Sequence, residues 1–124
     1  MEIGSKFTTE LNVTAELTAE KIGSGDMPVL ATPSMIAMME NAAMKCVSDD
    51  LEDGQTTVGI MMNASHVKAS PVGSKVYATA ELVAIDGRKL SFKIVAYQGT
   101  DVIGEATHDR FIVVREKFLA KVQQ

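Results

Sequence analysis

The stretch PVLATPSMIAMMENAAMKCV, residues 28–47, decides the fold of this chain. From Pro33 to about Val47 almost every residue is apolar, which predicts a helix with hardly any polar face. Such a helix lies buried inside a domain rather than on its surface. Thr32 and Pro33 suit its beginning, because Thr can cap a helix and Pro fits the first helical position. The polar residues 48–50 predict its end.

Glu40 is the only charged residue between Asp26 and Lys45 and therefore stands alone in this apolar segment. An isolated buried charge is very costly, so its carboxylate needs a charged or hydrogen-bonding partner. Buried carboxylates of this kind are often functional, which makes Glu40 a candidate site residue. The other interpretations are a structural salt bridge, or a side chain that reaches solvent or a subunit boundary.

Length and composition are those of an ordinary globular protein. The 124 residues predict a single domain, residues 1–124, with 46% hydrophobic residues and a net charge of −4. That acidity, without a run of Lys or Arg, argues against nucleic acid as a partner. We expect no membrane segment and no signal peptide, because no apolar stretch has the required length. The single cysteine, Cys46, fits a reducing compartment and core packing, so a cytoplasmic location is expected.

Alternating apolar residues predict five strands, one before the helix and four after it. Their ranges are 6–17, 56–70, 75–85, 88–98 and 102–114, with hairpin turns at Asp86-Gly87 and at residues 98–101. The residues expected to point inward are Val58, Ile60, Met62, Ala64, His66, Val76, Ala78, Ala80, Leu82, Ala84, Leu90, Phe92, Ile94 and Ala96. In the last strand the alternation is unclear at residues 108–111, which suggests a β-bulge there.

One long apolar helix and an antiparallel meander together predict an α+β fold in which the sheet curls around the helix. Five strands cover only part of such a helix. The outer face of the sheet also carries Val83, Val95 and Tyr97. Both features predict burial against a second copy of the chain, and hence a homodimer or a higher oligomer.

Several short stretches resemble one known family from end to end of the chain. They are VLAT at 29–32, Glu40, GQTTVG at 54–59, ASHVKASPVG at 64–73, TAEL at 79–82, DGRKLSF at 86–92, IGEATHDR at 103–110 and EKFLAKV at 116–122. In these stretches the chain resembles the fluoroacetyl-CoA thioesterase-like family of hotdog-fold acyl-CoA thioesterases. The resemblance implies a hotdog fold and hydrolysis of a short or small acyl-CoA thioester.

The active-site pattern of that family is a Thr, a Glu eight residues later and a His twenty-six residues after the Glu. The same spacing selects Thr32, Glu40 and His66, to which the resemblance assigns catalysis. The Gly and Arg of the family fall on Gly59 and Arg110, which it assigns to substrate binding. Coenzyme A is then part of the substrate, and no separate cofactor is implied.

Each of these residues also has a purely structural interpretation. Thr32 suits a helix N-cap, although free N–H groups at the helix start also suit a thioester oxyanion. His66 alone suits a core histidine, whereas together with Glu40 it suits a base that activates water or orients a nucleophile. Gly59 suits a β-bulge or a close approach of ligand. Arg110 suits the partner of an acid or a wall of the pocket.

The predicted distances couple the site to the oligomer. Thr32 and Glu40 are eight residues apart, which is about 12 Å along a helix and too far for a direct hydrogen bond. If both act with His66 on one thioester, a two-fold interface brings one residue from a partner chain. Otherwise the acyl group spans the distance.

The phosphates of coenzyme A need a local basic patch, because the protein is acidic overall. The candidates are Arg88, Lys89, Lys68, Lys117 and Lys121. At the acyl end, the fluoroacetate-specific member of the family closes aromatic residues from before the helix over the fluorinated group. The corresponding stretch here, IGSGDMP at residues 22–28, has no aromatic residue. The sequence therefore argues against fluoroacetyl specificity and favours a short or small branched acyl chain.

Other functional classes stay open. A non-catalytic acyl-CoA or small-acid binding module would use the same pocket. Hotdog enoyl-CoA hydratases or dehydratases carry a dyad with a His at the helix, where this chain has none. In a purely structural dimer, packing alone would have to offset the cost of removing a buried Glu-His pair from water, and buried ion pairs often fail to recover that cost. No metal is expected, because His66 and His108 lack ligand spacing with Cys46.

Overall fold

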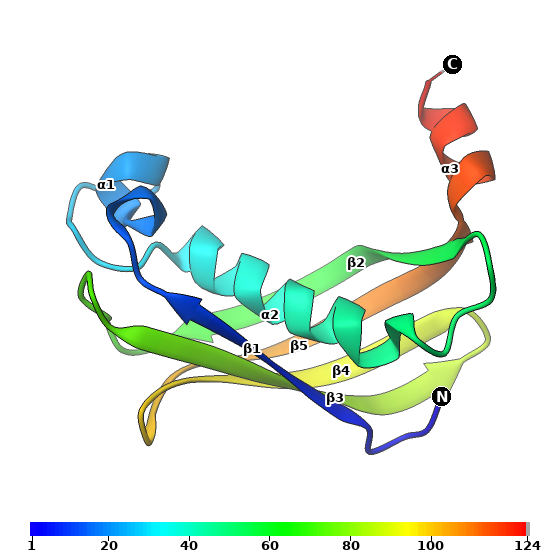
Figure 1. The fold of residues 1–124 in the computed structure, drawn as a ribbon, viewed down its shortest axis with the longest axis horizontal. Helices are drawn as coiled ribbons and strands as arrows, with labels where there is room; N and C mark the ends of the chain where they lie inside the picture. Colours follow the sequence, from blue (N-terminus) through cyan, green and yellow to red (C-terminus); the bar gives the residue numbers. More distant parts are fainter. Residues whose placement is uncertain (124) are drawn as a thin grey trace.

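A five-stranded antiparallel sheet curls around one long helix in the computed structural model, which describes residues 1–123 (Figure 1). The strands are β1 (Lys6–Asn12), β2 (Gln55–His66), β3 (Lys75–Asp86), β4 (Lys89–Gln98) and β5 (Asp101–Val114), and the long helix is α2 (Thr32–Ser48). Across the sheet the strands follow the order β1-β3-β4-β5-β2, so that β1 and β2 form its two edges. The predicted α+β architecture is confirmed.

The sheet buries one face of α2, and only that face. Its buried residues are Ser34, Met35, Met38, Met39, Ala42, Ala43 and Val47. On the opposite side Ile36, Glu40 and Met44 follow one another at four-residue intervals and stay partly exposed. The prediction that the helix is buried all round is therefore wrong for a single chain, because five strands wrap only part of its circumference. We call Ile36, Glu40 and Met44 the uncovered stripe of α2.

The helix begins one residue earlier than predicted, at Thr32, and Ala31 occupies the N-cap position. The interpretation of Thr32 as the capping residue is thus wrong. Pro33 lies in the first turn as expected, where its missing N–H costs no helical hydrogen bond. The Thr32 side chain is consequently available for another partner.

Most predicted inward residues of β3 and β4 form the core, together with the buried face of α2. The exception in these strands is Ala84, because a shift of pairing register between Leu82 and Ala84 turns it outward. In β2 a second shift, between Gly59 and Met61, leaves Ile60 unpaired and 52% exposed. The predicted inward positions of Val58 and Ile60 are therefore wrong. Before this bulge the inward residues are Thr57 and Gly59.

Strand β5 alternates regularly where a bulge was predicted. His108 and Arg110 are both buried, and Asp109 between them is less so. Gly59 pairs with Arg110 and Met61 with Asp109, so the extra residue lies in β2 rather than in β5. The predicted β-bulge is therefore in β2, the strand that pairs with β5, and the prediction that it lies in β5 is wrong.

Both predicted hairpins are confirmed by the pairing of Asp86 with Lys89 and of Gln98 with Asp101. Three short helical segments were missed: a 3-10 turn (Ala15–Leu17), α1 (Ala19–Ile22) and α3 (Arg115–Val122). The first of these replaces the predicted end of strand β1. Within residues 1–123 no helix is long and apolar enough to cross a membrane.

Candidate active site

Thr32 and His66 meet where α2 begins and β2 ends. The Thr32 Oγ1 and His66 Nδ1 atoms are 2.8 Å apart and share a hydrogen bond. The second ring nitrogen of His66, Nε2, is buried and has no hydrogen-bond partner among residues 1–123. Burial lowers the pKa of His66 below its ordinary value near 6.5, and the nearby backbone of Lys68 opposes that shift in part. The imidazole is therefore neutral at pH 7 and is able to accept a proton.

A second cluster forms around Glu40, halfway along α2. The Nη1 atom of Arg110 lies 4.0 Å from Oε2 of Glu40. Arg110 is only 6% exposed. Its Nε atom donates to Oγ1 of Thr57 at 2.8 Å, and its Nη2 atom donates to the Thr57 carbonyl oxygen at 3.0 Å. The expectation that Arg110 pairs with an acid is confirmed. The Glu40 side chain, in contrast, is 42% exposed, so in one chain it lies at a boundary rather than in the core.

Gly59 stands at the β-bulge that one of its two interpretations predicted. A Cβ atom added to it would lie 3.1 Å from Glu40 Oε2 and 3.3 Å from His108 Cε1. A larger residue would push the carboxylate away from Arg110. The glycine therefore makes room for the Glu40 cluster.

His108 belongs to this cluster and was missed as a site residue. Its side chain is 1% exposed, with Nδ1 2.7 Å from the carbonyl oxygen of Met61 and Nε2 3.2 Å from Nη1 of Arg110. Burial is the main cause that lowers the pKa of His108, so it is neutral at pH 7. The signal was present in the sequence, because positions 108 and 110 fall on one face of a strand.

The two clusters stay apart within one chain. Thr32 and Glu40 are separated by about two helical turns, roughly 12 Å. Along β2, Gly59 and His66 are seven residues apart, about 23 Å for an extended strand. The structure thus brings Thr32 to His66 and Glu40 to Arg110, but it does not join the three predicted catalytic residues in one subunit.

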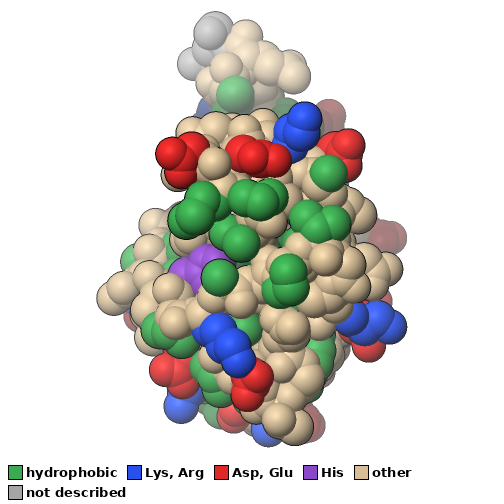
Figure 2. Space-filling view, turned by 90° about the vertical axis from the view of Figure 1, so that its left-hand side faces the viewer, with side chains coloured by type: hydrophobic (Ala, Val, Ile, Leu, Met, Phe, Trp, Pro, Cys, Tyr) green, Lys and Arg blue, Asp and Glu red, His purple; other side chains and the backbone are tan. Residues whose placement is uncertain are grey.

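A cavity of about 280 Å³ adjoins the Thr32–His66 pair. Its lining includes Ala19, Val29, Leu30 and Val67, which are apolar, and Lys68, whose ammonium group pairs with Asp101 at 2.6 Å. Figure 2 shows this end of the molecule, where a histidine lies among hydrophobic side chains on the surface. A small cavity, apolar on part of its wall, therefore adjoins a base.

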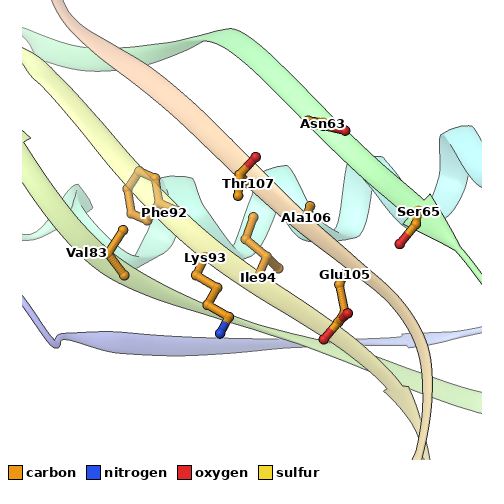
Figure 3. A pocket seen from close by; sticks show the side chains of 9 residues that line it. All are labelled: Asn63, Ser65, Val83, Phe92, Lys93, Ile94, Glu105, Ala106 and Thr107. Carbon is orange, nitrogen blue, oxygen red and sulfur yellow. The ribbon is translucent and has the colours of Figure 1, made fainter.

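Three other hollows lie away from the Thr32–His66 pair. A groove of about 650 Å³ runs between β1 and α2. A furrow of about 540 Å³ crosses the face of the sheet that points away from α2, with Lys93 and Glu105 on its surface (Figure 3). A pocket of about 290 Å³ lies between the β3–β4 hairpin and α3.

The pocket beside α3 gathers three of the predicted phosphate ligands. Arg88, Lys117 and Lys121 line it together with Phe111 and Phe118. Lys89 lies next to this pocket in β4. We call Arg88, Lys117 and Lys121 the basic patch. Within residues 1–123, no group of three or more His, Cys, Asp or Glu side chains is arranged to hold a metal ion.

Comparison with known proteins identifies the relatives of this chain. The model of the family described as fluoroacetyl-CoA-specific thioesterase matches residues 13–116. The chain belongs to this family. Thioester hydrolysis and the hotdog fold, both implied by the sequence resemblance, are properties of the family and are thereby confirmed at that level.

Individual relatives agree with the assignment. The fluoroacetyl-CoA thioesterase of Streptantibioticus cattleyicolor is 36% identical over 130 residues, which cover 100% of this chain and 94% of the relative. A solved structure of a mutant of fluoroacetyl-CoA thioesterase in complex with acetyl-CoA has a TM-score of 0.95 at 34% identity, covering 100% of this chain and 98% of that one. A thioesterase superfamily member from Thermus thermophilus has a TM-score of 0.91 at 27% identity, covering 98% and 90%.

Proposed function

We propose that this protein hydrolyses a short or small branched acyl-CoA thioester to the free acid and coenzyme A. The observation that carries the proposal is the hydrogen bond of 2.8 Å between Thr32 and His66, beside a cavity lined in part by apolar side chains. A hydroxyl within hydrogen-bond reach of a neutral imidazole is the arrangement of a nucleophile and its base. Membership of a thioesterase family supports the same reaction.

In this mechanism Nδ1 of His66 takes the proton of the Thr32 hydroxyl as Oγ1 attacks the thioester carbonyl. The new carbon–oxygen bond forms, the carbon–sulfur bond breaks, and the imidazolium returns the proton to the leaving thiolate. Water then hydrolyses the acyl ester on Thr32 with His66 again as base. The positive end of α2, at which Thr32 lies, favours the negative charge that develops on the carbonyl oxygen.

Glu40 completes the site from a second subunit in this proposal. A proton transfer from Thr32 to Nδ1 requires His66 to carry its other proton on Nε2, which has no acceptor within the described part of the chain. Glu40 offers a half-exposed carboxylate next to the edge strand β2. A two-fold axis beside β2 would bring Glu40 of one copy to His66 of the other, and each half-site would supply what its counterpart lacks.

The proposed substrate follows from the two ends of the site. Residues 22–28 contain no aromatic side chain to close over a fluorinated acyl group, and the adjoining cavity of 280 Å³ has room for a short chain. At the other end, the basic patch with Phe111 and Phe118 suits the phosphates and adenine of coenzyme A, with Lys89 close by. Together with the single cysteine, this substrate agrees with a cytoplasmic location.

Free-thiol release from a panel of short, medium, branched and aromatic acyl-CoAs tests the function. The wild-type protein is expected to turn over short or branched substrates, and Glu40→Gln and His66→Gln to lose at least about a hundredfold in kcat. Light scattering and circular dichroism on the same samples control for mass and folding. A folded dimer that binds acyl-CoA but releases no thiol would instead support the non-catalytic binding module.

Thr32→Ser and Thr32→Ala form the matched pair for the nucleophile. Serine keeps the hydroxyl beside His66, so we expect it to retain activity and the alanine variant to lose it. Mass spectrometry of wild-type protein quenched during turnover should detect the chain plus one acyl group. If Thr32→Ala hydrolyses the thioester as fast as the wild type, Thr32 is not the nucleophile.

A further inference from the structure

The hydrogen bonds of His108 fix its tautomer. A carbonyl oxygen only accepts, so the contact of 2.7 Å with the Met61 carbonyl requires the proton on Nδ1. Nε2 then carries a lone pair, and Nη1 of Arg110 donates to it at 3.2 Å. With both ring nitrogens engaged and the side chain 1% exposed, a single neutral state satisfies the site.

The same contact completes the anchoring of Arg110. Its Nε and Nη2 atoms donate to Thr57 in β2, and Nη1 donates to His108 in β5. The three donors are different nitrogens of one rigid, planar group. The bonds therefore fix the guanidinium between the two strands. Nη1 has a second N–H, and Glu40 Oε2 lies 4.0 Å from this nitrogen.

The bulge in β2 creates this arrangement. The extra residue at Ile60 lets Thr57 and Gly59 face inward before it and Met62 after it, while the Met61 carbonyl accepts from His108. Gly59 leaves the space in which His108 Cε1, Arg110 Nη1 and Glu40 Oε2 converge, at 3.3, 3.5 and 3.1 Å from a Cβ atom that it lacks. The bulge in β2 and the small size of Gly59 thus make room for the His108 imidazole.

We infer that His108 is a positioning residue, which as a neutral Nδ1–H imidazole holds Arg110 against Glu40. The inference rests on the proposed function, in which Glu40 acts with the partner's His66. Removal of the Nε2 acceptor would leave the guanidinium held by Thr57 alone, so the whole group could tilt about those two bonds and Nη1 would lose its fixed place beside Glu40.

Burial and the positive charge of Arg110 lower the pKa of His108 and keep it neutral, although Glu40 and Asp109 act in the opposite direction. Arg110 faces Nε2, Glu40 approaches from α2, Asp109 adjoins it in β5, and Phe92 of β4 packs at 6.2 Å between ring centroids. A proton on Nε2 would set two positive donors against each other at 3.2 Å. Burial also opposes the imidazolium form.

Nitrogen NMR tests the tautomer without any measurement of activity. The chain has two histidines, so the His108→Gln variant assigns both rings in a long-range proton–nitrogen spectrum of labelled protein. At pH 7 we expect the His108 ring to have a protonated Nδ1 and an unprotonated Nε2. A protonated Nε2, or the imidazolium form, would overturn the inference even if the protein is an active thioesterase.

A double-mutant cycle tests the action through Arg110. His108→Leu removes donor and acceptor at similar size, His108→Gln keeps one of each without charge, and Arg110→Gln removes the group to be positioned. We expect His108→Leu to lower kcat about ten- to a hundredfold, His108→Gln to retain most of it, and His108→Leu to change kcat less than about twofold in the Arg110→Gln background. KM for acyl-CoA should change little.

Equal losses in both backgrounds would mean that His108 acts independently of Arg110, and would contradict the positioning role. Melting temperature and mass of every variant separate misfolded protein from a true kinetic effect. If the wild type releases no thiol at all, the proposed function fails, while the NMR result still decides whether His108 donates to Met61 and accepts from Arg110.

Discussion

At Gly59 the lack of a side chain sets the geometry of a whole cluster. A Cβ atom there would meet Glu40 Oε2 at 3.1 Å, closer than an ordinary contact, although that oxygen is the end of a flexible side chain. At Gly104 a Cβ atom would meet the backbone oxygen of Ser65 at 2.7 Å and Met35 Sδ at 2.6 Å. The first conflict can be relieved by moving the carboxylate, whereas the second involves backbone and core.

Gly59→Ala is therefore expected to damage activity more than stability. Moving Glu40 away from Arg110 should lower kcat/KM about tenfold or more, with only a small change in melting temperature. Gly104→Ala is the matched control and should lower the free energy of unfolding by about 1–3 kcal/mol through overpacking. Thermal melts and thiol release measure both. Equal activity of Gly59→Ala and wild type would remove Gly59 from the site.

The two histidines predict a loss of stability in mild acid. Burial lowers the pKa of both His66 and His108 in the folded chain below the ordinary value near 6.5. The unfolded chain therefore binds more protons than the folded one once the pH falls through about 6.5, and stability decreases toward lower pH. We expect the melting temperature to fall between pH 7 and pH 5, and to fall less in His108→Gln. An identical pH dependence in that variant would contradict a buried neutral His108.

The rate of thioester hydrolysis should also decrease toward low pH, because His66 becomes protonated there. The proposed base works only as the neutral imidazole, and its pKa lies below 6.5. The rate should therefore increase with pH through an apparent pKa below that value and be flat near pH 7 to 8. A rate profile of kcat/KM measures it. A rate that does not change with pH between pH 5 and pH 8 would contradict His66 as the base.

Among the elements, α3 stands out because every one of its residues is exposed. It extends β5 and points away from the sheet, as Figure 1 shows. Its Lys117 and Lys121 nevertheless share a pocket with Arg88 from the β3–β4 hairpin. In the proposed binding of coenzyme A, this exposed helix supplies cations for the phosphates. Its contribution to the core is small.

Removing the two lysines should weaken binding of the nucleotide end of the substrate alone. Lys117→Ala with Lys121→Ala is expected to raise KM for acyl-CoA roughly two- to tenfold, since exposed ion pairs are individually weak. KM for an acyl-N-acetylcysteamine, which lacks the phosphates, should not change. Lys75→Ala, a surface cation in β3, is the control. An equal effect on both substrates would place the phosphates elsewhere.

The uncovered stripe of α2 predicts where the proposed dimer forms. Ile36 and Met44 flank Glu40 beside the edge strand β2, and the sheet leaves all three partly exposed. Met44→Lys should therefore shift the mass measured by light scattering from dimer to monomer and abolish thiol release. Ala37→Lys, on the exposed β1 side of the same helix, is expected to leave the dimer intact. A Met44→Lys protein that stays dimeric would rule out this stripe as the interface.

At the scale of the whole molecule, the proposed site belongs to two chains. His66→Gln and Glu40→Gln are each expected to be inactive. In a mixed dimer, one site would combine a native His66 with a native Glu40, so an equal mixture refolded together should regain about a quarter of wild-type activity. Activity that stays at the level of the single variants would show that each chain holds its own complete site.

The sequence by itself determined the framework. The apolar helix, the alternation of β3 and β4 and the two hairpin turns follow from local rules, because each depends on neighbours close in the chain. The stretches that resemble the thioesterase family point to Thr32, Glu40 and His66 in the same way. None of these features requires knowledge of what packs against what.

Only the tertiary structure decided how the polar residues are grouped. Thr32 leaves the capping role to Ala31 and meets His66, because the end of β2 comes to the start of α2. One unpaired residue, Ile60, reverses the alternation of β2 and turns Gly59 toward Glu40. The glycine indicated a bulge, but no local pattern indicated which residues of β2 then face inward. His108 meets the Met61 carbonyl across 47 residues of chain, and Glu40 meets Arg110 across 70 residues, from position 40 to position 110. Contacts between strands and helix depend on register in space rather than on spacing in sequence.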